Sequence, residues 1–415
     1  MNFSYLKSQK VLLKNQYLNE YLNIQVKDFL TGLIEQIIGE EFSEHIRRKK
    51  YERISKTTGV RQYRNGYRKR YYIAKFYVGL EIRIPRCRDG KFIPLLFKDA
   101  GILDTELEKI LIHQWSEGNS YRDITNFVKK VYGERISLGL MHRMIKKIDG
   151  YVKEFHERKI DKEYDAIYID GLEICVKDQV PSIKNRYGNR RYVRIGKNIV
   201  LLGVLGQRRE GEKIVREMLD YRFSKTENTE SFVDLLWSLK KRGLGSERFK
   251  LAVHDGEESI SKAIKIVYGK EKVAEQECLF HKLLNMTKLV RDDVNGEEIR
   301  KDIWSVYGAK EISIYEEKEK QVIEKWKRRE PEVISLFKKS NERLKTKYNF
   351  DEKMHKSIHT NNPIERYFRE LRRRIKAIGI FENMESADRL IFLMVESINQ
   401  KRGSLPTNSN LKFTH

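Results

Sequence analysis

Residues 166–176 read AIYIDGLEICV, and this apolar run around one aspartate decides the fold class. Its β-branched and apolar residues predict a strand over Asp165–Val176. Further β-rich segments at Arg191–Gln207 and Lys213–Phe223 complete a meander. Helices and strands then alternate, with expected helices at Glu227–Arg242 and Ser259–Val267 and expected strands at Phe249–Val253 and Lys272–Leu279. A meander followed by such an alternation predicts an α/β domain with a mixed sheet.

The segments before this domain predict a helical region and a small β module. Residues 1–59 are expected to be largely helical, because apolar side chains recur there at helical spacing. These side chains are Phe29, Leu33, Ile37 and Ile38. Residues 60–100 combine two β-rich runs with the turn signals Asn65-Gly66 and Asp89-Gly90. Tyrosines alternate with Arg and Lys in this module, which suits nucleic-acid binding or simple packing in a short sheet.

Residues 101–155 predict two amphipathic helices joined by a short link at Tyr132–Arg135. The first helix carries apolar residues on one side, at Tyr121, Ile124, Phe127, Val128 and Val131. Ser137 is placed to cap the second helix. That helix is expected to bury Leu140, Met141, Met144, Ile145 and Ile148 and to expose Arg143, Lys146 and Lys147. A helix, a Gly-containing turn and a basic second helix form the helix-turn-helix pattern, which any αα-hairpin also produces.

The net charge indicates the class of partner. The 415 residues include 84 Lys and Arg against 60 Asp and Glu, a formal charge of +24. On a chain with 40% hydrophobic residues, this excess indicates a folded protein with a polyanionic partner, most often nucleic acid. The charge is spread along the chain, which disfavours a membrane surface, and no apolar run is long enough to cross a membrane. Three separated cysteines and the lack of a signal-peptide pattern predict a cytoplasmic protein. The positive charge predicts that it is associated with DNA.

Three acidic residues lie where α/β proteins hold ligands. Asp170 is inside the first strand, and Asp255 ends the strand in LAVHDG, where the carboxyl ends of strands commonly bind ligands. Glu365 follows a helix-start signal in which Asn362 can cap and Pro363 fits the first position. If the three acids converge, their oxygen atoms would select Mg²⁺ or Mn²⁺. Two such ions about 3.5–4 Å apart would suit phosphoryl transfer.

Each of these acids also has a structural alternative. Asp170 fits a strand-edge or turn residue, Asp255 fits a cap for the following helix, and Glu365 fits a capping box. Asp165 competes with Asp170, and because their positions differ by an odd number, they face opposite sides of one strand. Only one of the two can join the cluster, and Asp170 is preferred because it lies within the strand rather than at its entry.

Four segments together resemble the mutator-type insertion-sequence transposases. RNGYRKR with IRIPRCRDGKFIP resembles the family's N-terminal block, and IYIDGLEI resembles its first-Asp strand. HDGEESISKAI with QECLFHKLLNM resembles the second-Asp motif followed by a Cys-x-x-His pair. TNNPIERYFRELRRR resembles the glutamate motif. The match covers about residues 60–395 in the family's order.

The resemblance implies a DDE triad at Asp170, Asp255 and Glu365 on a ribonuclease H-like fold, served by two Mg²⁺ (or Mn²⁺) ions per active site. It also implies that the long helical stretch between the last two acids is an insertion that holds transposon-end DNA. The expected fold is therefore multidomain α+β: a helical and small β N-terminal DNA-binding region with a helix-turn-helix, then a ribonuclease H-like α/β catalytic core interrupted by an all-helical insertion. The expected divisions are an N-terminal helical region (1–59), a basic β module (60–100), the helix-turn-helix region (101–155), the first part of the core (160–281), the insertion (282–358), the C-terminal helical part of the core (359–400) and a flexible tail (401–415).

Basic and aromatic residues near these motifs are candidate DNA contacts. They are Arg64, Arg68, Arg143, Lys146, Lys147, His281, Arg366, Arg369, Arg372, Arg373 and Arg374. For the arginines of the glutamate helix the alternative is a solvated basic face. Trp304 or Trp326 would stack on an exposed base at the cleavage point, unless each is part of a helical core. Cys278 and His281 are not assigned a zinc ion, because a structural zinc site needs four ligands and no second pair follows.

These expectations describe a DNA transposase. It would bind the terminal inverted repeats of an insertion sequence, cleave the ends by metal-dependent hydrolysis and join the 3′-hydroxyl ends to target DNA, acting as a homodimer on paired ends. A non-catalytic, domesticated DNA-binding protein would explain the charge and the helix-turn-helix but would leave the three acids as coincidence. A ribonuclease H-type nuclease would hydrolyse DNA without joining it.

Overall fold

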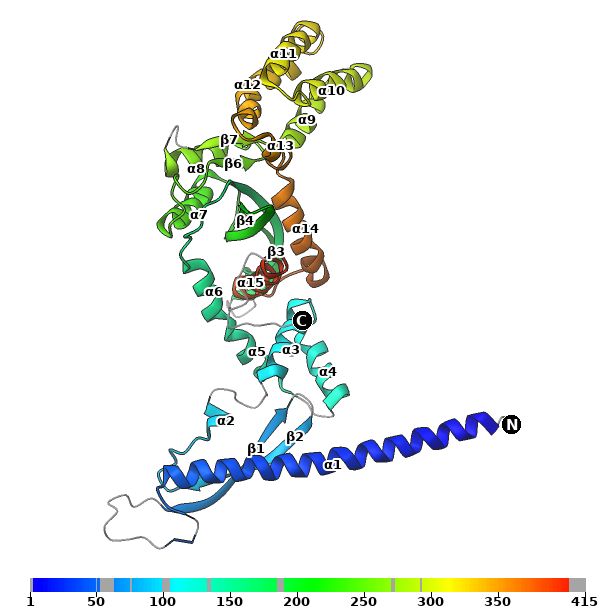
Figure 1. Ribbon diagram of the computed structural model, residues 1–415, viewed down its shortest axis with the longest axis vertical. Coiled ribbons are helices and arrows are strands. Elements are labelled where there is room, and N and C mark those ends of the chain that lie inside the picture. The colour runs from blue at the N-terminus through cyan, green and yellow to red at the C-terminus, as the bar shows by residue number, and fades with distance from the viewer. Residues whose placement is uncertain are drawn as a thin grey trace. The chain divides into compact units, whose positions relative to one another are not determined.

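The computed structural model describes residues 3–49, 51–52, 63–74, 77–98, 105–132, 136–184, 190–269, 273–291 and 293–402. The chain divides into two units between Lys146 and Lys147, and each is described by itself (Figure 1). Most of the expected link at 132–135 and most of the expected tail at 401–415 lie outside the described residues. Among the helices described, none combines the length and the apolar character needed to cross a membrane.

In the first unit a long helix packs against a β-hairpin. Helix α1 (Phe3–His45) contacts strand β2 (Tyr77–Cys87), which pairs with β1 (Arg64–Ala74). The helix residues in this core are Leu30, Ile34, Ile38 and Phe42. The expected helix is confirmed, but of the residues whose spacing indicated it, Phe29, Leu33 and Ile37 are exposed. Neighbouring positions are apolar in pairs (29/30, 33/34, 37/38), so the sequence contains two overlapping stripes and the hairpin covers only one.

The expected turn at Asn65-Gly66 is wrong. Asn65-Gly66 does not join two strands but lies inside β1, where Gly66 has a φ of 71°. The register with β2 shifts between Arg64 and Tyr67, which is the signature of a bulge. Gly90, with a φ of 69°, follows β2 in the turn that was expected there.

The remaining helices of the first unit are α2 (Leu95–Lys98), α3 (Thr105–Ser116), α4 (Tyr121–Tyr132) and α5 (Leu138–Lys146). Helices α3, α4 and α5 contact one another. The Ser137 hydroxyl accepts a 3.1 Å hydrogen bond from the Leu140 N–H, as expected of a cap. Helix α4 buries Ile124 and Val128 but leaves Phe127 and Val131 exposed, so its apolar side is narrower than expected. Helix α5 buries Met141, Met144 and Ile145 as expected.

The second unit is built on a five-stranded mixed sheet of order β5-β4-β3-β6-β7. Its strands are β3 (Ala166–Lys184), β4 (Arg190–Glu210), β5 (Lys213–Ser224), β6 (Leu251–His254) and β7 (Ala274–Glu277). The first three pair antiparallel in sequence order, whereas β6 pairs in parallel with β3 and β7 in parallel with β6. The expected meander and the mixed sheet are confirmed, but β3 continues eight residues beyond the expected end at Val176.

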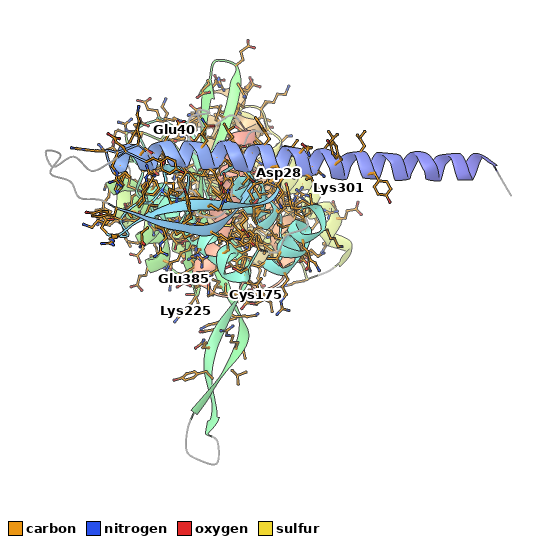
Figure 2. All side chains as sticks on the ribbon, turned by 90° about the horizontal axis from the view of Figure 1, so that it is seen from below. Asp28, Glu40, Cys175, Lys225, Lys301 and Glu385 are labelled. Atoms are coloured by element: carbon orange, nitrogen blue, oxygen red, sulfur yellow. The ribbon has the colours of Figure 1, made fainter. Side chains whose placement is uncertain are left out.

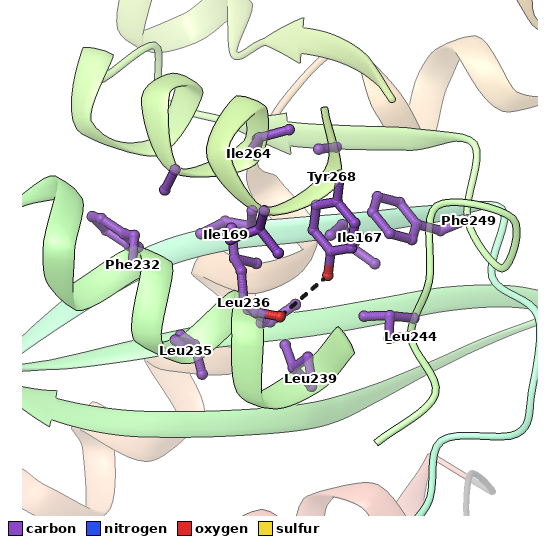
Figure 3. Close-up of a cluster of buried hydrophobic side chains, with 14 of the residues drawn as sticks. Ile167, Ile169, Phe232, Leu235, Leu236, Leu239, Leu244, Phe249, Ile264 and Tyr268 are labelled. Atoms are coloured by element: carbon purple, nitrogen blue, oxygen red, sulfur yellow. Dashed lines mark hydrogen bonds between the residues drawn. The ribbon is translucent and has the colours of Figure 1, made fainter. Parts of the chain in front are cut away.

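Helices cover both faces of this sheet. Helices α7 (Thr229–Lys241) and α8 (Glu258–Tyr268) pack on the face that carries Ile167 and Ile169, as Figure 3 shows. There the Tyr268 hydroxyl donates a 3.5 Å hydrogen bond to the Leu236 carbonyl. Because side chains alternate along a strand, Asp170 belongs to the opposite face. Helix α14 (Asn362–Ile378) packs on that face through Phe368, whose ring would lie 2.9 Å from a Cβ atom at Gly203. Helices α6 (Ile148–Glu157) and α15 (Met384–Lys401) complete the unit.

An all-helical segment lies between β7 and α14, as the charged stretch of sequence there indicates. It consists of α9 (Leu279–Thr287), α10 (Asp293–Tyr307), α11 (Ile312–Trp326), α12 (Pro331–Lys345), a 3₁₀ turn (Thr346–Asn349) and α13 (Glu352–Ile358). The segment has a hydrophobic core of its own around Tyr315, Trp326 and Phe337, all of them fully buried.

Candidate active site

The pairing of β3 with β6 sets Asp170 level with Asp255. Ile167 is opposite Ala252 and Tyr168 is opposite Val253 in this parallel pair. Continued along both chains, the same register brings position 170 opposite position 255. Asp255 directly follows the last residue of β6, so its side chain extends from the carboxyl end of a buried strand.

Glu365 reaches the same region from the first turn of α14, which contacts β3. The Asn361 side chain joins the two elements, because its Nδ2 donates a 3.5 Å hydrogen bond to the carbonyl of Ile169, the residue before Asp170. Asn361 is fully buried, and its carbonyl accepts the backbone N–H groups of Ile364 and Glu365. One buried residue thus contacts the strand of Asp170 and the helix of Glu365.

The pKa of Asp170 reflects its burial and the charges of other acids. Burial raises the pKa of the Asp170 carboxyl to about 8, and the charges of Asp255, Glu365 and Glu227 act in the same direction. A hydrogen bond of 2.9 Å from the Gly171 N–H opposes the rise. Asp165 lies before β3, and its charge acts instead on Tyr168. The oxygen atoms of Asp170, Asp255 and Glu365 do not all lie within 4.8 Å of one another. The acids are nevertheless near enough for the charges of Asp255 and Glu365 to act on Asp170, and a fourth carboxyl group acts on it as well.

That fourth group, Glu227, was missed by the sequence reasoning. It lies just before α7, and its carboxyl rests against Gly171, where an added Cβ would be only 2.0 Å from Oε1. Burial raises the pKa of Glu227, as do the charges of Glu257 and Asp255. The glycine next to Asp170 was the available signal, since it leaves room beside the aspartate. Nothing in the sequence shows which side chain fills that room.

The start of α14 differs from the expected one. The helix begins at Asn362, and Asn361 occupies the N-cap position without a capping hydrogen bond from its side chain, so the expected cap at Asn362 is wrong. The Asn361 N–H donates to Sγ of Cys278 at 3.2 Å, which leaves it unavailable for a capping box with Glu365. The alternative role of Asp255, a cap for the following helix, is supported in part, because the Asp255 Oδ1 accepts the Glu257 N–H at 3.0 Å just ahead of α8.

Cys278, His281 and Glu365 form a second potential ligand group beside the acids. Their Sγ, imidazole nitrogen and carboxylate oxygen lie within 4.8 Å of one another, close enough to hold a metal ion. The His281 Nδ1 is 3.8 Å from Glu365 Oε1 and makes no hydrogen bond to the described residues. Burial raises the pKa of Cys278, which opposes its thiolate form, although backbone N–H groups of His281 and Asn361 lower it in part.

An aromatic cavity adjoins Glu365. It has a volume of about 310 Å³ and is lined by Leu279, Phe280, Trp304, Thr360, Asn362, Glu365 and Arg369. Phe280 and Trp304 are 59% and 55% exposed, so their rings are accessible to a ligand. Trp326 is different: it is fully buried, and its Nε1 donates a 2.8 Å hydrogen bond to Asp302. The expectation that Trp326 stacks on a base is therefore wrong, because the core of the helical segment encloses it.

The basic candidates divide by their surroundings. Exposed ones are Arg68, Arg143, Lys146, Lys147, Arg366, Arg369, Arg372 and Arg373. Arg374 is buried and so is a poor phosphate contact. Arg64 is also poorly placed, because its guanidinium donates to the Arg48 carbonyl at 3.1 Å and lies over the ring of Phe42. Residues three apart lie on the same side of a helix. Arg366 and Arg369 share the exposed side of α14, whereas Arg374 lies three residues after the buried Leu371 and therefore faces inward.

Comparison with known proteins gives one consistent result. The family model "Transposase, Mutator family" matches residues 2–402. The transposase for insertion sequence element IS905 of Lactococcus lactis is 25% identical over 391 residues, 94% of this chain and 92% of that protein. The transposase for insertion sequence element IS256 in transposon Tn4001 of Staphylococcus aureus is 26% identical over 389 residues, 91% of this chain and 92% of that protein.

Among solved structures, the Drosophila P element transposase strand transfer complex aligns with a TM-score of 0.40 and 9% identity, over 76% of this chain and 96% of that chain. A similarity this low supports no inference about this chain. The family match, in contrast, spans nearly the whole sequence and includes all the acids of the candidate site. The chain belongs to the Mutator family of transposases.

Proposed function

We propose that this protein is the DNA transposase of an insertion sequence. It binds the terminal inverted repeats as a homodimer, cleaves the ends and joins the 3′-hydroxyl groups to target DNA. The observation that carries the proposal is the placement of three acids from distant stretches of a chain in a transposase family: the β3–β6 register sets position 170 opposite position 255, and Asn361 joins the residue before Asp170 to the helix of Glu365. The curated relatives, named as insertion-sequence transposases over nearly their full length, support it.

We assign the second unit to the ribonuclease H-like class of folds. Three antiparallel strands are followed by two parallel strands, each of which comes after a helix on the same face. The helical segment between β7 and α14 then serves as the insertion. In the first unit, α4 and α5 serve as a helix-turn-helix, with Arg143, Lys146 and Lys147 on the exposed side of the second helix and its end.

The donor set at the acids suits a divalent cation. Burial, and secondarily the charges of neighbouring carboxyl groups, raise the pKa of Asp170, and a bound cation would favour its ionised form. Asp170, Asp255 and Glu365 would hold two Mg²⁺ or Mn²⁺ ions, which supply activation of water or a 3′-hydroxyl and charge neutralisation at the leaving oxygen. His281, whose Nδ1 lies 3.8 Å from Glu365 Oε1, helps to position DNA, and Trp304 stacks on an unpaired base in the cavity beside Glu365.

The test uses the full-length protein and a DNA carrying the element's own ends. Asp170→Asn, Asp255→Asn and Glu365→Gln are each expected to abolish Mg²⁺-dependent strand cleavage while end binding persists. Asp165→Asn is the matched control and is expected to cleave normally. A wild-type protein that binds but never cleaves would identify a DNA-binding regulator instead. Cleavage without any joined product would identify a nuclease.

A further inference from the structure

Strands β3 and β4 continue far beyond the rest of the sheet. They pair from Ala166 opposite Gln207 to Lys184 opposite Arg190. However, β5 pairs with β4 only from Val200 onward, and β6 pairs with β3 only at Ile167 and Tyr168. Within the described residues, positions 177–184 and 190–197 therefore form a two-stranded ribbon, which leads away from the unit in Figure 2. At about 3.3 Å per residue, each strand of this ribbon is roughly 25 Å long.

The base of the ribbon is anchored. Phe381, in the loop after α14, donates its N–H to the Cys175 carbonyl at 3.0 Å and accepts the Lys177 N–H at 2.8 Å. Glu382 forms ion pairs with Lys177 and Arg194 beside these bonds. Backbone hydrogen bonds on both sides of Val176 thus fix where the ribbon leaves the sheet, so it extends as a defined arm.

The ribbon is strongly basic, and residues 192–197 on its β4 strand are exposed. Residues 177–197 contain seven Lys or Arg and one acidic residue, Asp178. Tyr192 is 65% exposed and the Arg194 side chain 62% exposed, and Val193 and Ile195 are exposed too. A two-stranded ribbon has no core that could explain this composition. Cationic side chains mixed with accessible apolar ones complement the phosphates and the base edges of a nucleic acid.

We propose that this ribbon is an arm that enters the major groove of duplex DNA. The inference rests on the proposed function only in taking DNA as the substrate. The major groove is about 12 Å wide and admits a two-stranded β-ribbon. In it, the arginines neutralise phosphates, and Tyr192 and Val193 supply apolar contacts of the kind that thymine methyl groups accept. The arm leaves β3 directly after the segment that carries Asp170, so it extends the DNA contact beyond the cleavage site.

The test measures the affinity of the full-length protein for a random-sequence duplex across a salt series. Arg190→Gln, Arg191→Gln and Arg194→Gln are combined in one variant, and Arg→Lys at the same positions in a second. The Gln variant is expected to lower the slope of log affinity against log salt by about 0.9 per lost phosphate contact, thus by up to about 3, whereas the Lys variant keeps the wild-type slope. Thermal melting of both variants establishes that they are folded.

A matched control removes the same charge elsewhere, with Lys241→Gln, Lys250→Gln and Lys265→Gln, all exposed. An unchanged slope in the Arg→Gln variant, or an equal fall in this control, overturns the proposal. A third variant, Val193→Thr with Ile195→Thr, is examined by light scattering. If this variant is a monomer where the wild type is a dimer, and the Arg→Gln variant keeps its slope, the arm binds a second copy and the proposal is overturned. Wild-type cleavage, assayed separately, distinguishes a failure of this proposal from a failure of the transposase function.

Discussion

Cys278 Sγ accepts the backbone N–H of Asn361 at 3.2 Å, and through this contact two distant motifs meet. The N–H of Cys278 itself donates to the carbonyl of His254 at 2.7 Å, one residue before Asp255. Asn361 in turn accepts the N–H of Glu365 at 3.1 Å. A short series of buried hydrogen bonds therefore connects the backbone that holds Asp255 to the backbone that holds Glu365.

Replacing Cys278 tests this connection. Cys278→Ala leaves the buried N–H of Asn361 without its acceptor, and it is expected to lower the free energy of unfolding by about 1–3 kcal/mol. Cys278→Ser keeps an acceptor and is expected to recover part of that loss. Urea unfolding of both variants measures the difference, with Cys175→Ala as the control cysteine. Equal stability of the Ala and Ser variants would show that the sulfur contact is dispensable.

Gly171→Ala probes the room beside Asp170. The new Cβ would lie 2.0 Å from Glu227 Oε1 and 2.9 Å from Val200 Cγ1, so the Glu227 carboxyl must move. We expect weaker Mn²⁺ binding in calorimetry and slower cleavage, with little loss of stability, because a carboxyl end can rotate away. Gly150→Ala is the control: nothing lies within 4 Å of its added Cβ, and in helix α6 the change is expected to stabilise by about 0.5–1 kcal/mol. Wild-type Mn²⁺ affinity in Gly171→Ala would contradict the crowding.

The two tryptophans of the helical segment between β7 and α14 are expected to respond in opposite ways. Trp326→Ala opens a cavity in a closed core and should cost about 3–5 kcal/mol of unfolding free energy. Trp304→Ala should leave stability nearly unchanged but weaken the binding of DNA with an unpaired base at the cleavage point by about 1–3 kcal/mol. Urea unfolding and a fluorescent base analogue at that position report the two effects, and Trp304→Phe is expected to retain binding. A Trp304→Ala variant that binds such DNA normally would exclude stacking.

His156 makes the stability of the second unit depend on pH. Burial lowers its pKa, but hydrogen bonds to Asp220 at 2.6 Å and Asp388 at 3.4 Å outweigh burial, so the pKa of His156 is raised. Arg242, which pairs with Asp220 at 2.6 Å, and the Tyr221 hydroxyl, which donates to Asp388, share these carboxylates.

Since the folded pKa of His156 exceeds the unfolded value of about 6.5, its contribution is complete below that pH and is lost as pH rises through the folded pKa. His156→Gln is expected to flatten this fall in unfolding free energy, which urea titrations at several pH values measure. His113→Gln, in the exposed part of α3, is the control. A fall of the same size in His156→Gln would assign the pH dependence to another group.

The candidate site was predictable where local pattern and strand order suffice. Asp170 lies within one apolar strand and Asp255 directly follows another, and the parallel pairing of these two strands sets the two positions level with each other. Glu365 required the family resemblance, because a glutamate in a first helical turn is ordinary by itself. Glu227 was unpredictable, since its only distinction is contact with a glycine 56 positions earlier in the chain.

The local periodicity of the sequence determined the order of helices and strands and the apolar faces of α7 and α8. Its composition determined the excess of positive charge. Only the tertiary structure decided which of two apolar stripes on α1 is covered, which tryptophan is enclosed, and where β3 and β4 leave the sheet. The reason is physical: periodicity specifies the faces that an element offers, but burial is created by whatever distant segment packs against one of them.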